Sequence, residues 1–213
     1  MVEQSITAPP VPKGKIIAEG VAFDDYMERY ASDYCEWVRG VVIKMSPVTA
    51  EHDGLNRYIS QLMSAYFALN PIGLLREAPF VMRTEVAGRE PDLQIILNDN
   101  PGQLTETAMN GPADIVIEIV SKESVARDYG EKFEEYEKAG VREYWLFDPI
   151  RTHAAFHRLG DDGVYNTLGP DSNGDYITSL LPKLILNVPT LWQDQLPDFF
   201  AIGQSVQTMF GET

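Results

Sequence analysis

The chain has 213 residues, 44% of them hydrophobic and 23% charged, and a formal net charge of −15 at pH 7. This composition excludes a disordered polymer and predicts one domain that buries a sizeable core. No apolar run reaches the roughly twenty residues that cross a bilayer, which excludes a membrane-spanning protein, and the absence of a secretion signal makes the cytoplasm the expected location.

The first residues carry no periodic apolar pattern. Residues 1–19 include a Pro-Pro-Val-Pro stretch and predict a mobile arm, followed by a single domain over residues 20–213. Residues 21–34 predict a short helix. Residues 34–45 predict a hairpin that turns at Arg39-Gly40, with Glu36 in its first strand. A lone strand glutamate usually faces solvent.

The longest predicted helix covers residues 51–70, where apolar residues recur at helical spacing and predict a core-facing stripe. His52 lies in its first turn, where it caps the helix, binds phosphate or is simply exposed. Two extended segments follow, residues 73–86 and 91–97, with a turn expected at Gly88. Residues 98–112 are loop-rich and are expected to shape the opening of a site.

Residues 113–148 predict a strand, helix and strand. The first strand is a β-branched run of the kind that is buried on both faces. The helix covers residues 125–139, with Ser124 as its cap and Gly140 after its end. The second strand covers residues 144–147. This order favours parallel pairing of the two strands and a right-handed connection.

Two acidic residues mark these strands. Glu118 interrupts the first β-branched run, and a charge buried there costs several kcal/mol or more unless it is paired, protonated or bound to metal. Asp92 follows Pro91 at the start of an earlier strand. The two acids either share a divalent cation or serve as a turn acid and a buried, hydrogen-bonded carboxylate.

The rest of the chain predicts β structure and a closing helix. Residues 152–158 and 164–168 predict a hairpin, residues 176–188 continue as β structure, and a helix follows residue 189. Cys35, the single cysteine, excludes an internal disulfide. His153 and His157 are expected on a strand, and the three histidines are too scattered to predict a metal site.

The order Pro91-Asp92, then Glu118 within a hydrophobic strand, resembles the PD-(D/E)XK nuclease superfamily. A longer set of residues is similar to its Uma-type branch, a group of candidate endonucleases: Glu36 to Gly40, Met45-Ser46-Pro47, His52, Glu118-Ile119-Val120-Ser121, Arg127-Asp128, Gly130-Glu131-Lys132, Tyr136, Ala139-Gly140-Val141, Glu143-Tyr144-Trp145 and Asp148-Pro149. The resemblance covers residues 21–213. It implies a restriction-endonuclease-like α/β (α+β) fold, with a mixed, curved sheet flanked by helices and an additional C-terminal β-hairpin region.

The resemblance also implies metal-dependent hydrolysis of phosphodiester bonds in nucleic acid, with DNA as the expected substrate. Asp92 and Glu118 are expected to ligate Mg²⁺, for which Mn²⁺ can substitute, with the Ile119 carbonyl as a third oxygen. Glu36 is expected as a further ligand of the metal or of water.

The usual lysine two residues after the glutamate is absent, because Val120 occupies that position. The resemblance implies that Lys132, on the following helix, orients the attacking water and stabilises charge in the transition state. Lys132 falls on the polar side of the predicted helix, so a solvated surface position is the alternative. Lys122 is the second candidate for this role.

The expected substrate contacts are His52, Ser121, Lys122, Arg127 and Tyr136. The net charge of −15 opposes DNA binding, which depends on neutralising phosphates, so a local basic rim is required. Its candidates are Arg57, Arg76, Arg83, Arg89, Lys122 and Arg127. Two other hypotheses remain open: a noncatalytic module that binds nucleic acid or protein on a nuclease scaffold, and a homodimer formed through the C-terminal β region.

Overall fold

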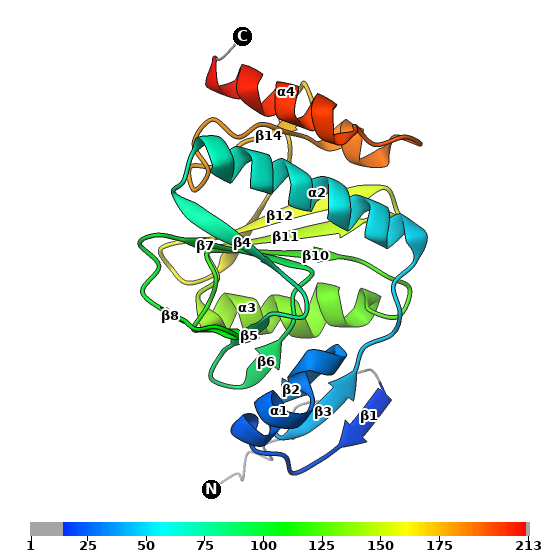
Figure 1. The fold of residues 1–213 in the computed structure, drawn as a ribbon, viewed down its shortest axis with the longest axis vertical. Helices are drawn as coiled ribbons and strands as arrows, with labels where there is room; N and C mark the ends of the chain where they lie inside the picture. Colours follow the sequence, from blue (N-terminus) through cyan, green and yellow to red (C-terminus); the bar gives the residue numbers. More distant parts are fainter. Residues whose placement is uncertain (1–14, 212–213) are drawn as a thin grey trace, which may run out of the picture.

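A six-stranded sheet lies at the centre of the computed structural model, which describes residues 15–211 (Figure 1). The strand order is β13-β12-β11-β10-β7-β4. The strands are β4 (Gly73–Glu77), β7 (Leu93–Leu97), β10 (Ile115–Ile119), β11 (Glu143–Asp148), β12 (His153–Leu159) and β13 (Tyr165–Leu168). Within this sheet, as described for residues 15–211, β10 and β11 are the one parallel pair, so the predicted strand, helix and strand crossover is confirmed.

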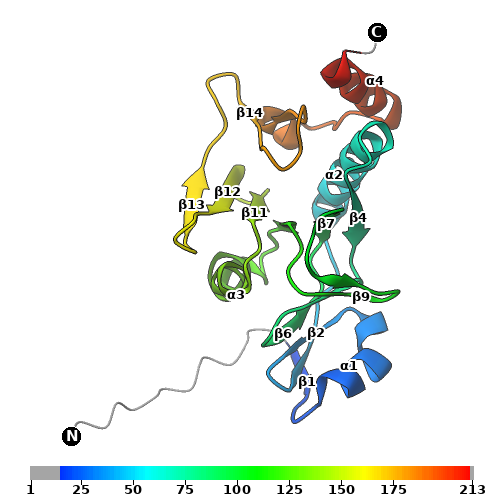
Figure 2. The ribbon, with the colours of Figure 1, turned by 90° about the vertical axis from the view of Figure 1, so that its left-hand side faces the viewer.

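Helices cover both faces of this sheet (Figures 1 and 2). On one face lie α2 (Ala50–Leu69) and α4 (Phe199–Phe210), and on the other lie the π-helical segment η2 (Arg127–Glu131) and α3 (Lys132–Ala139). Side chains alternate along β10: Ile117 joins the core under α2, whereas Val116 joins the core with α3. Glu118 has the same parity as Val116, so it faces the α3 side.

A second sheet of seven strands carries the N-terminal part of the chain, with the order β1-β3-β2-β6-β5-β9-β8. The strands are β1 (Lys15–Ala18), β2 (Cys35–Val38), β3 (Val41–Lys44), β5 (Val81–Arg83), β6 (Ala87–Arg89), β8 (Gln103–Leu104) and β9 (Ala108–Asn110). Helix α1 (Phe23–Arg29) packs against it through Tyr26, and η1 (Ala31–Asp33) follows. The predicted hairpin is confirmed, with Arg39 and Gly40 in the left-handed region at its turn.

The C-terminal part continues the central sheet through the predicted β12–β13 hairpin. Beyond it lie β14 (Asp175–Tyr176) and β15 (Leu186–Asn187), much shorter than predicted, and then η3 (Val188–Trp192). The architecture confirms the predicted α/β class with a mixed sheet flanked by helices. Among the helices within residues 15–211, none combines the length and apolar character needed to cross a membrane.

Two sequence predictions need correction in this region. The predicted arm does not extend to residue 19, because Lys15–Ala18 form β1 and pair with β3; residues 1–14 lie outside the described part of the chain. Gly88 is not a turn residue but lies within β6. A Cβ atom at this position would lie 2.7 Å from a ring carbon of Phe23, so the glycine allows close packing of α1 on the sheet.

The prediction of one domain over residues 20–213 stays a prediction. The predicted loop at residues 98–112 contains β8 and β9, and β9 pairs in parallel with β5. The segment runs from the end of β7 to the start of β10, so it lies at the opposite end of these strands from Asp92 and Glu118.

Candidate active site

Asp92 and Glu118 line the same cleft, which has a volume of about 280 Å³. The antiparallel pairing of β7 with β10 places Leu93 opposite Ile117, so the start of β7 lies beside the end of β10. The Ile119 N–H donates to Asp92 Oδ2 at 2.7 Å. Two acids separated in sequence therefore meet at one end of the central sheet.

Lys132 projects into this cleft and is buried. Its Nζ lies 2.7 Å from Glu118 Oε1, 3.1 Å from Glu36 Oε1 and 3.7 Å from Asp128 Oδ1. Burial opposes its charge, but the three carboxylates raise the pKa of Lys132 above its usual value. The lysine is thus a buried ammonium shared among acids, and the surface alternative is wrong.

The π-helical segment η2 lies directly before Lys132. The Lys132 N–H bonds to the carbonyl of Arg127, five residues back, instead of four as in an α-helix. Asp128 and Lys132, both in this turn, line the cleft, and Lys132 shares its helix face with the buried Tyr136 four residues on. Tyr129 is partly exposed, and its hydroxyl donates to Asp148 Oδ2 at 2.9 Å.

Glu118 is held from the helix by two groups. Lys132 and the Tyr136 hydroxyl both donate to its Oε1 at 2.7 Å. Burial, together with the charges of Asp92, Asp128 and Glu36, raises the pKa of Glu118 to about 8, although Lys132 opposes the shift. The positive charge of Lys132 therefore does not fully offset the negative charge of the acids around Glu118.

Glu36 enters the cluster from the other sheet. Arg89 of β6 donates from Nη1 to Glu36 Oε2 at 2.7 Å. It also donates two hydrogen bonds, of 2.8 and 2.9 Å, from Nε and Nη2 to the carboxylate of Glu135 on α3. Burial alone would raise the pKa of Glu36, but Lys132, Arg89 and Arg127 lower it to about 2. Arg89 thereby ties the seven-stranded sheet to the crossover helix beneath the cleft.

His52 lies beside Asp92. Its Nε2 is 3.2 Å from Asp92 Oδ2, and the ring is buried within the cleft wall. Thr49 caps α2 by accepting the His52 N–H at 3.2 Å. Burial lowers the pKa of His52, but the hydrogen bond and charge of Asp92 raise it overall. The histidine orients an acid of the cleft instead of capping the helix.

The remaining predicted contacts separate into two groups. Ser121, Ile119 and Arg127 line the cleft, and Tyr136 is buried behind Glu118. Lys122 is exposed and is not among the described residues that line the cleft, so it does not share the position of Lys132.

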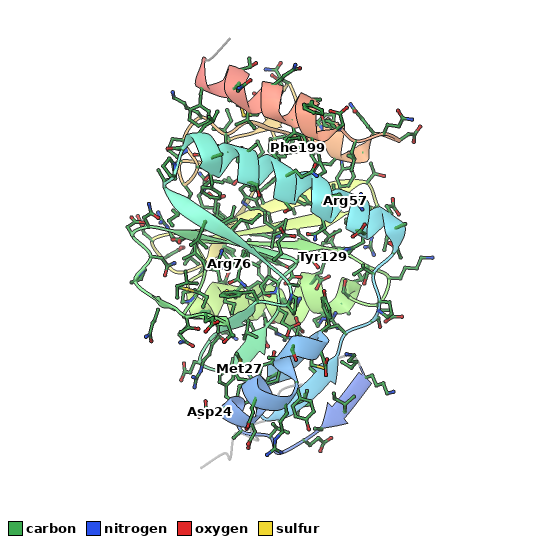
Figure 3. The ribbon with its side chains drawn as sticks, in the orientation of Figure 1. Asp24, Met27, Arg57, Arg76, Tyr129 and Phe199 are labelled. Atoms are coloured by element: carbon green, nitrogen blue, oxygen red, sulfur yellow. The ribbon has the colours of Figure 1, made fainter. Side chains whose placement is uncertain are left out.

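The prediction of a basic rim around the cleft is wrong, because the six candidate residues do not lie together on one surface. Arg89 is fully buried in its ion pairs, and Arg83 lines a different cavity of about 770 Å³ together with residues of the 98–112 segment. Arg57 and Arg76, labelled in Figure 3, belong to α2 and β4 and are not among the described residues that line the cleft. Of the six candidates, only Arg127 lines it.

Two lysines and two buried acids are among the cleft residues to which the sequence assigned no role. Lys15 and Lys44 are exposed at its mouth and pair opposite each other across β1 and β3. Glu90 and Asp128 also line it, and burial raises the pKa of both, that of Glu90 to about 8. The available signals were the step from Glu90 to Pro91-Asp92 and the four-residue spacing from Asp128 to Lys132.

The donor set fits a divalent cation held by few protein ligands. Within residues 15–211, no three acidic, histidine or cysteine side chains are arranged to hold a metal ion. Mg²⁺ commonly binds through one or two carboxylates and keeps several waters or substrate phosphate oxygens. Asp92 and Glu118 meet that requirement, and the excess of buried acids over cations favours a positive ligand.

Comparisons with known proteins agree with this architecture. The family model Uma2, described as "Putative restriction endonuclease", matches residues 23–189. A crystal structure of "a putative nuclease belonging to DUF820 from Anabaena variabilis ATCC 29413" is similar, with a TM-score of 0.68 and 15% identity, over 81% of this chain and 97% of that chain. A comparison with curated proteins gives no match.

Proposed function

Since the chain belongs to the Uma2 family, described as "Putative restriction endonuclease", we propose that it is a metal-dependent endonuclease that hydrolyses phosphodiester bonds in DNA. The observation that carries the proposal is the meeting of Lys132 with Glu118 at 2.7 Å in the cleft that Asp92 also lines. Two acids and a lysine at the end of a central sheet form the donor set that such hydrolysis requires.

Asp92 and Glu118 are the proposed ligands of Mg²⁺ or Mn²⁺, and the Ile119 carbonyl is the proposed third oxygen. A bound divalent ion supplies Lewis acidity and lowers the pKa of its water. The protein's part is to fix the ligands: the Ile119 N–H and His52 hold Asp92, and Tyr136 holds Glu118.

Lys132 has the proposed role of orienting the attacking water and stabilising negative charge on the phosphate. Glu36 supports it through an ion pair of 3.1 Å with the same ammonium, while Arg89 helps to keep Glu36 ionised and in place. The lysine is rigidly held, because its contacts come from both sheets and from its own helix. Such preorganisation is what charge stabilisation at a reacting centre needs.

Lys15 and Lys44 support an approach of DNA along the β1–β3 edge. Like charges directly opposite each other in a sheet repel, so this pair stabilises the fold less than a neutral pair would. A phosphate group between them removes the repulsion and gains two contacts. Exposed at the mouth of the cleft, they supply local positive charge on a chain whose net charge is −15.

Cleavage of a supercoiled plasmid in Mg²⁺ or Mn²⁺ tests the proposal. The wild-type protein should nick the plasmid, and Asp92→Asn, Glu118→Gln and Lys132→Met should each lower the rate by at least about 100-fold. Glu143→Gln is the matched control, because Glu143 is equally buried but lies outside the described residues that line the cleft. Absence of nicking by folded wild-type protein in every metal would refute the proposal.

A noncatalytic binding module on the same scaffold is the second candidate, favoured by the net charge of −15. It predicts DNA binding that a chelator leaves unchanged and that forms no product. The nuclease proposal predicts loss of cleavage after chelation and its return when Mg²⁺ is added. The homodimer and the cytoplasmic location stay predictions.

A further inference from the structure

Asp128 is a buried acid that lacks a close hydrogen-bonding partner. Its exposure is 0%, and within residues 15–211 neither carboxylate oxygen has a well-formed hydrogen bond, although the Ser124 side chain lies near enough to lower the pKa of Asp128. It lies on η2, one turn before Lys132, and it lines the cleft of Asp92 and Glu118. A buried carboxylate so weakly bonded requires a physical explanation.

Among the described residues, Asp128 is the buried acid with both carboxylate oxygens unbonded, whereas Glu36 and Glu90 each have one such oxygen. Glu143, also 0% exposed, accepts four hydrogen bonds of 2.6 to 2.9 Å from Trp145, Arg158, Tyr176 and Thr178. Asp148 accepts from the Tyr129 hydroxyl and from the backbone and side chain of Arg151. Glu143 and Asp148, which lie outside the described lining of the cleft, are thus satisfied by the fold, whereas Asp128 within the cleft is not.

The cations near Asp128 are already shared. Lys132 Nζ is 3.7 Å from Asp128 Oδ1, beyond hydrogen-bonding distance, and it makes its shorter contacts with Glu118 and Glu36. Asp92 adds a further negative charge on the same side. Lys132, Ser124 and Arg127 offset the burial of Asp128 only in part, because its pKa stays raised. A buried carboxylate that is incompletely compensated is costly, and a cation that enters from the cleft can provide the rest.

We propose that Asp128 is a third acid of the metal centre, and that its oxygens accept hydrogen bonds from water molecules bound to the divalent ion. This inference rests on the proposed function, and it adds a residue to the site. Contact through water is proposed because Mg²⁺ commonly keeps several waters and takes one or two carboxylates, which Asp92 and Glu118 would supply. Carboxylates that bond the ligands of a metal commonly contribute 10- to 100-fold to its affinity.

The inference is tested by the effects of Asp128→Asn on metal affinity and on metal-free stability, which should change in opposite directions. Asp128→Asn keeps the size of the side chain but removes its charge, so it should weaken Mn²⁺ binding by about 10- to 100-fold in isothermal titration. Without metal, the melting temperature should stay equal or rise, because an uncompensated buried charge is lost. Asp128→Ala serves as the second variant, and circular dichroism checks that both fold.

Glu143→Gln is the matched control. It also neutralises a buried carboxylate, but one with four donors, so it should lower the melting temperature and leave Mn²⁺ affinity unchanged. If Asp128→Asn and Asp128→Ala bind Mn²⁺ as tightly as the wild type, or if they lose only metal-free stability, Asp128 is structural and the inference is wrong.

The failure of this inference can be told apart from the failure of the proposed function. Wild-type binding that is abolished by Asp92→Asn but unaffected by Asp128→Asn overturns the role of Asp128 alone. Absence of Mn²⁺ binding to the wild-type protein overturns both proposals together.

Discussion

Replacing Lys132 with methionine tests the buried charge cluster most directly. Methionine has a similar length, so the change removes an ammonium while filling most of the space. In the folded protein, that ammonium contacts Glu118 at 2.7 Å and Glu36 at 3.1 Å, and all three groups are almost fully buried. The variant leaves these carboxylates without their common cation.

The expected loss of stability is about 3–5 kcal/mol, the usual range when one partner of a buried ion pair is removed. For a chain of this size, that loss corresponds to a fall in melting temperature of about 6–20 °C. Glu118 can take up a proton readily, since its pKa is already raised to about 8 by burial and neighbouring acids. The loss should therefore grow as pH rises.

Thermal and urea unfolding without metal give the measurement. Lys138→Met is the matched control, because Lys138 lies on the same helix and also pairs with an acid four residues before it, Glu134, but both side chains are largely exposed. It should unfold like the wild type. Adding Glu118→Gln to Lys132→Met should recover part of the lost stability, because one of the uncompensated acids is then neutral.

A Lys132→Met protein that unfolds at the wild-type temperature would refute this reasoning. It would mean that the acids are neutral in the folded chain, and that Lys132 is not the cation that holds the cluster together.

Three further predictions concern the pH dependence of stability, the exposed lysines at the cleft and the packing of α1. Burial and nearby acids raise the pKa of Glu118 from 4.5 to about 8, so the folded chain holds a proton that the unfolded chain releases. Metal-free stability should therefore fall between about pH 5 and 8, by at most about 1.4 kcal/mol per pH unit for this group. Glu118→Gln should reduce that slope in urea titrations and leave the part due to Glu90; an unchanged slope would contradict the assignment. Combined Lys15→Ala and Lys44→Ala substitutions should weaken DNA binding in anisotropy assays and lower the salt-dependence slope by up to about 2, whereas an equal slope would show that DNA enters elsewhere. Gly88→Ala should lower stability by about 1–3 kcal/mol because its methyl group meets a ring of α1 at 2.7 Å, and wild-type stability would show that the helix shifts freely.

The strands at the site could be predicted because their signals are local. A β-branched run around Glu118 and a Pro-Asp pair at the start of β7 indicate strands, and an acid in each indicates where charge must be compensated. The sheet then brings the two acids together through antiparallel pairing. That pairing follows from the whole fold, so only the family resemblance pointed to it.

The rest depended on contacts between elements far apart in the sequence. Lys132 was predicted on the polar side of its helix, but it shares a helix face with the buried Tyr136 and pairs with Glu118 and Glu36 from the two sheets. Gly88 looks like a turn residue, but its role is to allow close packing. Arg89 looks like a surface cation, but two carboxylates from distant elements surround it. No local pattern reports contacts of this kind.

The position of Lys132 on a helix has a consequence for how the cleft keeps its shape. A lysine on β10 would be fixed by the hydrogen-bonded ladder of the sheet, whose register tolerates almost no sliding. Here the distance from Lys132 to Glu118 depends on how η2 and α3 sit on that sheet, and so on the packing of buried side chains such as Tyr136. Residues outside the cleft therefore set the alignment of its charged groups, and small changes in the packing of the core alter the distance between Lys132 and Glu118.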